Sequence, residues 1–360
     1  NKTLRDVLLK TAKFESVVKK GETFASVELE SAAKYAAEDA WITLRFYNSF
    51  SKKLEPNMLK IAKEIEFDFI LTLLDMEDNG IKVNQSKLKE LIDKNNTQLE
   101  SLKVKIYELC GIKFNINSTK QLGEVLFDGL KLPSKKKTKT GYSTDESVLS
   151  ELVELHPCVA KILEYRELYK LQSTYCEPIL NLAQKDVDSR VYTSFIHTGT
   201  ATGRLASKNP NLQNIPARGS YAKPFRAVFE AKDGYSLLSL DYSQIELRLL
   251  AHFSEDVALV EAFKSGKDIH AQSAINIFGE SNEQNRAIAK SINFGLIYGM
   301  GVNKLSANLD IDKKAAKEYI TRYFNAFSGV QDYLQSIKDS AKRDGFVETL
   351  LSRRRYFDFS

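Results

Sequence analysis

The sequence predicts a predominantly helical α+β protein, and three features of its pattern support this prediction. Apolar residues recur at helical spacing through most of the chain, with helix-start and helix-stop residues at the boundaries of these stretches. After Asp186 the composition shifts: residues 191–196 alternate as a strand does, and a polar, turn-rich tract follows over 197–216. A chain of 360 residues, 43% hydrophobic and 28% charged, is long enough for two or three folded domains.

The composition excludes several classes of protein. There is no long uncharged apolar run, so we expect no membrane span, and the first six residues lack the apolar stretch of a signal peptide. The cysteines Cys110, Cys158 and Cys176 are widely spaced without a C-x-x-C motif, which indicates neither a disulfide framework nor a zinc site. A reducing, intracellular setting fits this pattern best.

The net charge of +5 is concentrated in one stretch, because residues 113–140 hold seven lysines against two acidic residues. Such a run is either a solvated loop or a surface that contacts phosphates. We expect helices before and after this lysine-rich loop, over residues 29–50, 59–76, 87–110 and about 143–183. Ser143 and Glu146 have the spacing of a capping box, and Pro157 and Pro178 predict breaks in the last helix.

Residues 235–240 form a candidate buried strand that leads directly to Asp241. A carboxylate at the end of a rigid strand is well placed to hold a divalent cation. The alternative is structural: Asp241 helps to start the following helix, and Ser243 with Glu246 forms a capping box. From Ser243 to about Arg343 the pattern is again mostly helical.

A helix over residues 285–299 carries the most informative pattern. Arg286, Lys290, Phe294 and Tyr298 are each four residues apart, so they fan over about 120° of one helix face. Ile288, Ile292 and Leu296 lie opposite and can anchor the helix in a core. Cations suit a triphosphate and aromatic faces suit a base and its sugar, whereas a purely structural helix would leave the cations on the surface and the aromatics in the core.

The tract 198–218 is dense in Arg, Asn and Gln, with Gln213 and Asn214 between the apolar residues Leu212 and Ile215. Such side chains can donate to the minor-groove acceptors that base pairs share, which would sense duplex geometry without sequence preference. The alternative is an exposed loop, since Asn-Pro and Gly are turn formers.

Together these segments resemble the family A (polymerase I type) DNA polymerases. Residues 241–248 look like motif A of that family, residues 286–298 like motif B, the fingers helix, and residues 202–216 like its duplex-contacting palm motif. Residues 163–166 and 170–175 look like its thumb-to-palm helix. The resemblance implies a right-hand polymerase fold with thumb, partial palm and fingers.

The resemblance also implies an activity and its site. The protein would add dNTPs to a primer 3′-OH on a DNA template by two-metal chemistry with Mg²⁺. Asp241 and the Tyr242 carbonyl would bind the metal ions, and Arg286, Lys290 and His270 would hold the triphosphate. The other residues implied to line the nucleotide site are Gln244, Glu246 as a steric gate against a ribose 2′-OH, Phe294 on the sugar and base, and Tyr298 near the template base.

Primer–template DNA would contact the polar tract and the lysine-rich loop, through Arg204, Asn211, Gln213, Asn214, Arg218, Lys135, Lys136 and Lys137. The resemblance divides the chain into an exonuclease-domain remnant (1–55), thumb (56–185), first part of the palm (186–246) and fingers (247–360). It implies a cytoplasmic monomer.

The sequence departs from the family pattern in two places. The His-Asp pair that carries the family's second metal-binding Asp is absent, because each of the four histidines is followed by another residue type. Tyr35 and Asp39 resemble the last motif of the proofreading exonuclease, but its earlier acidic motifs are missing, so we expect no exonuclease activity. The alternatives are a non-catalytic DNA-binding fragment, and a reverse transcriptase-like or lesion-bypass role.

Overall fold

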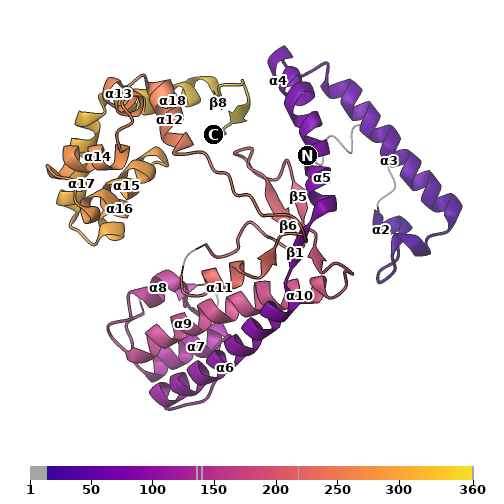
Figure 1. Cartoon of the computed structure of the whole chain (residues 1–360), viewed down its shortest axis with the longest axis horizontal. Helices are drawn as coiled ribbons and strands as arrows, with labels where there is room; N and C mark the ends of the chain where they lie inside the picture. Colours follow the sequence, from indigo (N-terminus) through magenta and orange to yellow (C-terminus); the bar gives the residue numbers. More distant parts are fainter. Residues whose placement is uncertain (1–13, 135–136, 139–140, 218, 359–360) are drawn as a thin grey trace. The chain divides into compact units, whose positions relative to one another are not determined.

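The computed structural model describes residues 14–134, 137–138, 141–217 and 219–358, and it divides into two units. One unit comprises residues 1–69 and 331–360, and the other comprises residues 70–330 (Figure 1). The described residues are mostly helical, with four small antiparallel sheets, which confirms the predicted fold class. None of their helices combines the length and the apolar character needed to cross a membrane.

The first unit contains helices and one hairpin. Its elements are α2 (Phe14–Val17), the 3₁₀ turn η1 (Phe24–Ser26), α3 (Leu29–Phe50), α4 (Pro56–Ile61), the π-helical turn η2 (Ala62–Glu66), β8 (Phe346–Glu348) and β9 (Arg354–Tyr356). The predicted bounds of α3 are confirmed. Arg353 pairs with Glu66 and Arg354 with Glu55, so two ion pairs hold the hairpin on α4 and η2.

The second unit begins with helices packed around one apolar core. They are α5 (Phe67–Asn79), which starts in the first unit, α6 (Gln85–Cys110), α7 (Thr119–Gly123), η3 (Glu124–Gly129), α8 (Glu146–Ser150), α9 (Pro157–Leu171), η4 (Gln172–Cys176) and α10 (Glu177–Ala183). The long helix predicted over 87–110 is confirmed as α6, and Pro157 and Pro178 lie in the first turns of α9 and α10. Leu88 and Ile106 of α6 and Ile162 of α9 are fully buried in this core, and α6 packs against α9.

Small sheets join this helical layer to the polar tract. Strand β1 (Ile81–Val83) is central between β4 (Arg190–Val191) and β7 (Phe229–Glu230), with Ile81 opposite Val191. Strand β5 (Ser194–Ile196) pairs with β6 (Ala206–Lys208), and β2 (Lys137–Thr138) pairs with β3 (Gly141–Tyr142). The single strand predicted over 191–196 is therefore two strands of different sheets, because the chain leaves β1 after Val191.

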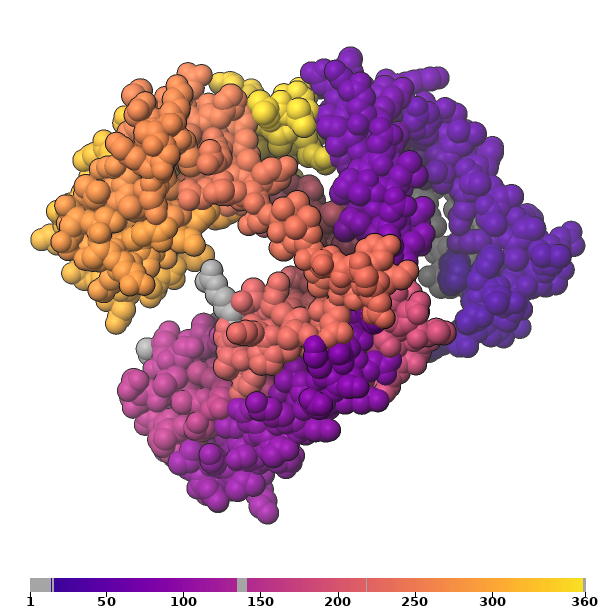
Figure 2. Space-filling model, viewed as in Figure 1, coloured from indigo at the N-terminus to yellow at the C-terminus, as the bar shows by residue number. Residues whose placement is uncertain are grey.

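A second group of helices follows residue 243, as predicted. After the short α11 (Ala222–Arg226) come α12 (Ile245–Ser254), α13 (Val257–Lys264), α14 (Ile269–Phe278), α15 (Glu283–Ile297), α16 (Val302–Leu309), α17 (Lys313–Ala326) and α18 (Ser328–Asp344), which continues into the first unit. Figure 2 shows the side chains of α14 to α17, in orange, as a closely packed body. The contact between α14 and α15 is the most extensive of any helix pair in the described residues.

Three local predictions are wrong. Ser143 and Glu146 do not form a capping box, because Asp145 is the residue that precedes α8 and it makes no side-chain cap bond. Residues 235–240 are not a buried strand: they are exposed, with Leu238 81% and Leu240 84% accessible. No described strand lies beside this segment, and a strand needs a hydrogen-bonded neighbour and a covered face. Ser243 and Glu246 do not form a capping box either, because α12 begins at Ile245 with Gln244 in a left-handed conformation and without a side-chain cap.

Candidate functional site

The helix α15 presents the predicted stripe. Asn282 caps it by accepting a hydrogen bond from the Asn285 amide at 2.8 Å. The buried face consists of Ala289, Ile292, Asn293 and Leu296, which pins the opposite face outward. Arg286 and Lys290 are exposed, Phe294 is half-buried, and Tyr298 follows the last helical residue with 64% of its surface accessible. The predicted anchoring by Ile292 and Leu296 is confirmed.

Asp268 holds the start of α14 against the start of α15. Its Oδ1 accepts from the amides of His270 and Ala271 at 2.9 and 3.1 Å, and its Oδ2 accepts from Arg286 Nε at 2.8 Å. Burial opposes ionisation of this carboxyl, but the hydrogen bonds from Arg286 and the two amides outweigh it and lower its pKa. Because Nε donates to the carboxylate, the orientation of the Arg286 guanidinium is fixed, and no described residue accepts a hydrogen bond from its terminal nitrogens.

His270 lies within the same helix pair, with its ring 5.7 Å from that of Phe294. Burial lowers the pKa of His270. The positive charges of Arg286 and Lys290 lower it further, whereas the negative charge of Asp268 raises it. The ring is therefore neutral near pH 7. The two predicted triphosphate-binding cations, Arg286 and Lys290, therefore lie close enough to His270, the third such residue, to influence its pKa.

Glu246 joins two other predicted site residues. Its Oε1 accepts a hydrogen bond from Tyr298 and another from Arg204 Nη2 at 3.2 Å. The hydrogen bond to Glu246 raises the pKa of Tyr298. The residues come from α12, the end of α15 and the polar tract, so segments 42 and 52 residues apart in sequence meet at one carboxylate. Gln244, two residues earlier in the chain, has a buried Oε1 with no hydrogen-bond partner among the described residues.

Asp241 and Tyr242 are not brought into a metal site. Both are exposed, and Asp241 makes no hydrogen bond with the described residues. Within the described ranges no group of three or more His, Cys, Asp or Glu residues is arranged to hold a metal ion. A divalent cation needs about six oxygen ligands, so one carboxylate and one carbonyl do not complete a site for Mg²⁺.

The polar tract is held by its own side chains. Gln213 accepts from the Ser207 amide at 3.1 Å and donates to the Leu205 carbonyl at 3.1 Å, while Asn211 Oδ1 accepts from the amides of Gln213 and Asn214. Ser207, which the sequence did not single out, is buried and accepts from the Leu212 and Gln213 amides. The structural interpretation therefore accounts for Asn211 and Gln213.

Asn214 and Arg204 remain exposed on this tract. The Asn214 carbonyl accepts from Tyr175 at 2.8 Å, and no described residue bonds its side-chain amide. Asn214 lines a cavity of about 460 Å³ together with Arg166 and Lys170 of α9. Both cations lie in the segments that resemble the thumb-to-palm helix, but no sequence pattern places them beside the tract.

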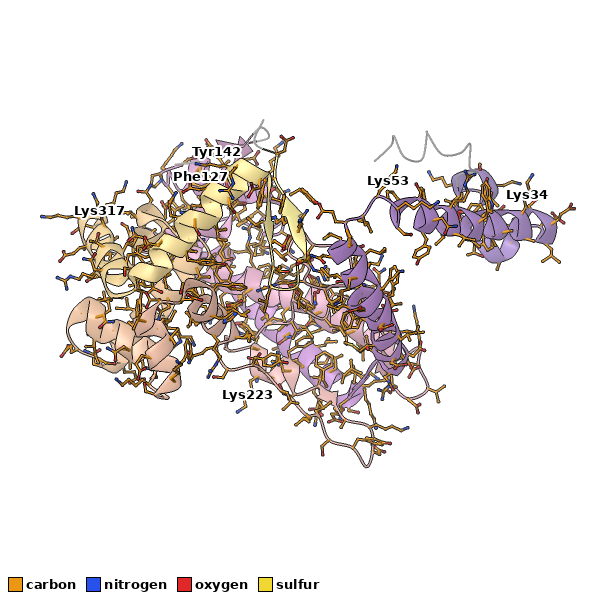
Figure 3. The ribbon with its side chains drawn as sticks, turned by 90° about the horizontal axis from the view of Figure 1, so that it is seen from above. Lys34, Lys53, Phe127, Tyr142, Lys223 and Lys317 are labelled. Carbon is orange, nitrogen blue, oxygen red and sulfur yellow. The ribbon has the colours of Figure 1, made fainter. Side chains whose placement is uncertain are left out.

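The predicted lysine contacts are only partly within the described residues. Lys135, Lys136 and Arg218 lie outside them, and Lys137 is placed in β2 by its backbone. The hairpin of β2 and β3 is anchored by Tyr142, whose ring lies 4.8 Å from that of Phe127 and whose hydroxyl donates to Asp128 at 2.7 Å (Figure 3). The lysine-rich loop predicted from sequence thus contains a hairpin fixed to the helical core.

Comparison with known proteins gives consistent matches. The sequence matches DNA polymerase family A over residues 85–359. It is 44% identical over 353 residues to DNA polymerase I of Treponema pallidum (strain Nichols), covering 97% of this chain and 35% of that protein. It is 49% identical over 309 residues to DNA polymerase I of Helicobacter pylori (strain 26695), covering 85% of this chain and 34% of that protein. The chain therefore spans about a third of the length of these relatives.

A solved structure is also similar. The polymerase domain of Pol1 from M. smegmatis, in complex with DNA primer-template and dNTP, has a TM-score of 0.77 and 38% sequence identity. The match covers 83% of this chain and 53% of that one.

Proposed function

Because the chain belongs to DNA polymerase family A, we propose that it is part of a template-directed DNA polymerase that extends a primer with dNTPs. The observation that carries this proposal is that Arg204 and Tyr298 both donate hydrogen bonds to the carboxylate of Glu246, at the end of the stripe of α15. Similarity to a polymerase domain bound to primer-template and dNTP supports it. The polymerase would act as a monomer in the cytoplasm, in replication or repair.

The nucleotide site would lie on α14 and α15. Arg286, oriented by Asp268, and Lys290 would bind the triphosphate, because charge-assisted hydrogen bonds to phosphate are strong and Arg presents a fork of donors. His270 would add a neutral donor. Phe294, half-buried against that ring, would pack on the sugar and base, while the exposed Tyr298 would stack near the template base.

Glu246 would set the choice between deoxyribose and ribose. Its hydrogen bonds from Arg204 and Tyr298 fix its side chain at the end of the stripe, where a nucleotide bound by Arg286 and Lys290 would place its sugar. Gln244, whose buried Oε1 has no partner in the described part of the chain, would contribute to the same site.

Two Mg²⁺ ions would supply activation of the primer 3′-OH and neutralisation of the leaving pyrophosphate. Asp241 and the Tyr242 carbonyl would provide part of their ligands. The described residues do not complete this site. The remaining carboxylate would come from a longer form of the protein.

Primer–template DNA would lie along the polar tract and the lysine hairpin. Arg204 and Asn214 present exposed donors. The cavity that Asn214 lines also contains Arg166 and Lys170, but three glutamates line it as well, so it adds no net positive charge. Lys135, Lys136 and Lys137 would contact the DNA backbone, and Lys137 belongs to the hairpin that Tyr142 anchors. In this scheme residues 56–185 are the thumb, 186–246 the first part of the palm, 247–360 the fingers, and 1–55 the end of an exonuclease-like domain.

A second candidate is a DNA-binding fragment without catalysis, favoured by the single carboxylate at Asp241. Primer extension and primer–template binding, measured on the 360-residue chain with Mg²⁺ and four dNTPs, separate the two. We expect binding without extension from this chain, and extension from a longer polypeptide that includes a His-Asp motif. Full extension by Asp241→Ala in that polypeptide would refute the metal assignment, and absence of extension by the unaltered polypeptide would favour the second candidate.

A further inference from the structure

A buried polar chain runs between α14 and α15. His270, Ser273 and Asn293 are 3%, 0% and 1% accessible, and the side chains around them on the two helices are apolar: Ile269, Ala274, Ile277, Ala289, Ile292 and Leu296. Packing alone would be served by apolar residues at these positions, since buried polar groups stabilise a core only when all are hydrogen-bonded.

The three side chains are hydrogen-bonded in series. Asn293 Nδ2 lies 3.0 Å from His270 Nδ1, and Ser273 Oγ lies 3.0 Å from Asn293 Oδ1. Among the described residues the other ring nitrogen, Nε2, has no partner. The buried side-chain polar atoms without partners are Gln244 Oε1 and Tyr323 OH, so Nε2 of His270 reaches the surface although its ring is otherwise covered.

These contacts select a tautomer. In a neutral imidazole one nitrogen donates and the other accepts. Ser273 Oγ lies 2.8 Å from the Ile269 carbonyl and 3.0 Å from Asn293 Oδ1, so its one proton is shared between these two acceptors. The structure places Asn293 Nδ2, and not Oδ1, against the ring, where it donates to Nδ1 and leaves the proton on Nε2. Burial keeps the ring neutral, and the charged groups that act on it are Asp268, Arg286 and Lys290. A phosphate oxygen only accepts hydrogen bonds, so Nε2 can serve it only when it carries the proton.

We propose that Asn293 is a positioning residue that holds His270 as the Nε2–H tautomer, aimed at a phosphate oxygen of the incoming nucleoside triphosphate. The proposal rests on the proposed function of the α14–α15 surface. Ser273 acts one step behind by fixing the Asn293 amide. A purely structural role, in which Asn293 sets only the register of the two helices, requires no particular tautomer.

The tautomer is read from the ¹⁵N shifts of the His270 ring in long-range ¹H–¹⁵N spectra of the 360-residue chain, assigned with His270→Gln. We expect Nε2–H in the unaltered protein. Asn293→Asp keeps the size but only accepts, so the proton should move to Nδ1 and the pKa of His270 should rise. Asn276→Asp is the matched control: it makes the same change on α14, where Asn276 contacts Gln272 instead.

Ser273→Ala is the second variant, because it removes only a hydroxyl and should mix the two tautomers by freeing the amide to turn. An Nδ1–H tautomer in the unaltered protein overturns the proposal. If Asn293→Asp fails to fold, a single unchanged tautomer in Ser273→Ala overturns it as well.

The functional part is tested by binding of dTTP with Mg²⁺ to the chain on a primer–template with adenine as the templating base. Asn293→Asp should weaken dTTP binding roughly tenfold or more, the effect of losing a hydrogen bond to a charged group, and Asn276→Asp should not. Unchanged affinity in Asn293→Asp, with weaker binding in Lys290→Ala, overturns the positioning role alone. Unchanged affinity in Lys290→Ala and Arg286→Ala would instead refute the triphosphate site.

Discussion

Replacing Asp268 separates two contributions that meet at one carboxylate. Asp268→Ala removes the cap on the His270 and Ala271 amides, which costs about 1 kcal/mol of local stability. It also removes the pair with Arg286, whose contribution lies below about 1 kcal/mol because the two side chains are 46% and 40% exposed. We therefore expect α14 to open more readily by roughly 1–2 kcal/mol, and Asp268→Asn, which keeps the cap acceptor, by less than about 1 kcal/mol.

Amide hydrogen exchange over residues 268–278 measures this directly, with the peptides of α17 as an internal control. Exchange should quicken roughly five- to thirtyfold in Asp268→Ala and by less than about fivefold in Asp268→Asn. The pKa of Asp268 is lowered in the folded protein, so its contribution is complete above the unfolded pKa and is lost as the pH falls through the lower folded value. Equal exchange in both variants would refute the division into cap and ion pair.

Four further predictions concern Glu246, Ile292, the lysines 135–137 and Tyr142. Glu246→Ala, in a longer polypeptide that extends primers, should raise ribonucleotide incorporation relative to dNTPs, and an unchanged ratio would reject the gate. Ile292→Ala should lower the stability of the α14–α15 pair by about 2–5 kcal/mol in denaturant unfolding, because the side chain is fully buried; a change below about 1 kcal/mol would contradict this. Replacing the three lysines 135–137 by Ala should reduce the slope of log K against log salt by about 2–3 for primer–template binding, and an unaltered slope would exclude these contacts. Tyr142→Phe keeps the ring contact with Phe127 but loses the hydrogen bond to Asp128, so we expect it to leave the salt slope unchanged. A decrease in slope as large as that of the lysine variant would contradict the proposed anchoring of the hairpin by the ring.

The helices could be predicted from sequence because their signals are local. The bounds of α3 follow from periodicity alone, and α6 ends at Cys110 before a glycine in the left-handed conformation. The stripe of α15 was predictable for the same reason: spacing of four fixes which side chains share a face, whatever the helix packs against.

Contacts between segments distant in sequence could not be predicted in this way. An apolar run such as residues 235–240 reads as a strand, but pairing depends on a neighbour that the pattern of the run itself does not specify. The side-chain amide of Gln213 could donate either to DNA or to its own loop, and the sequence pattern does not distinguish the two. In the structure it donates to the Leu205 carbonyl. The convergence of Arg204 and Tyr298 on Glu246, and the contact of Asn293 with His270, could be seen only in the folded structure.

Binding of a matched nucleotide tests the central claim most directly, namely that the α15 stripe holds an incoming dNTP opposite a template base. Fluorescence anisotropy of a labelled primer–template, bound by the 360-residue chain with Mg²⁺, is compared with and without the complementary dNTP. We predict tighter binding with the complementary dNTP but not with a mismatched one, and loss of this gain in Lys290→Ala but not in the matched surface control Lys304→Ala. A gain that persists undiminished in Lys290→Ala, or no gain in the unaltered chain, would contradict the assignment.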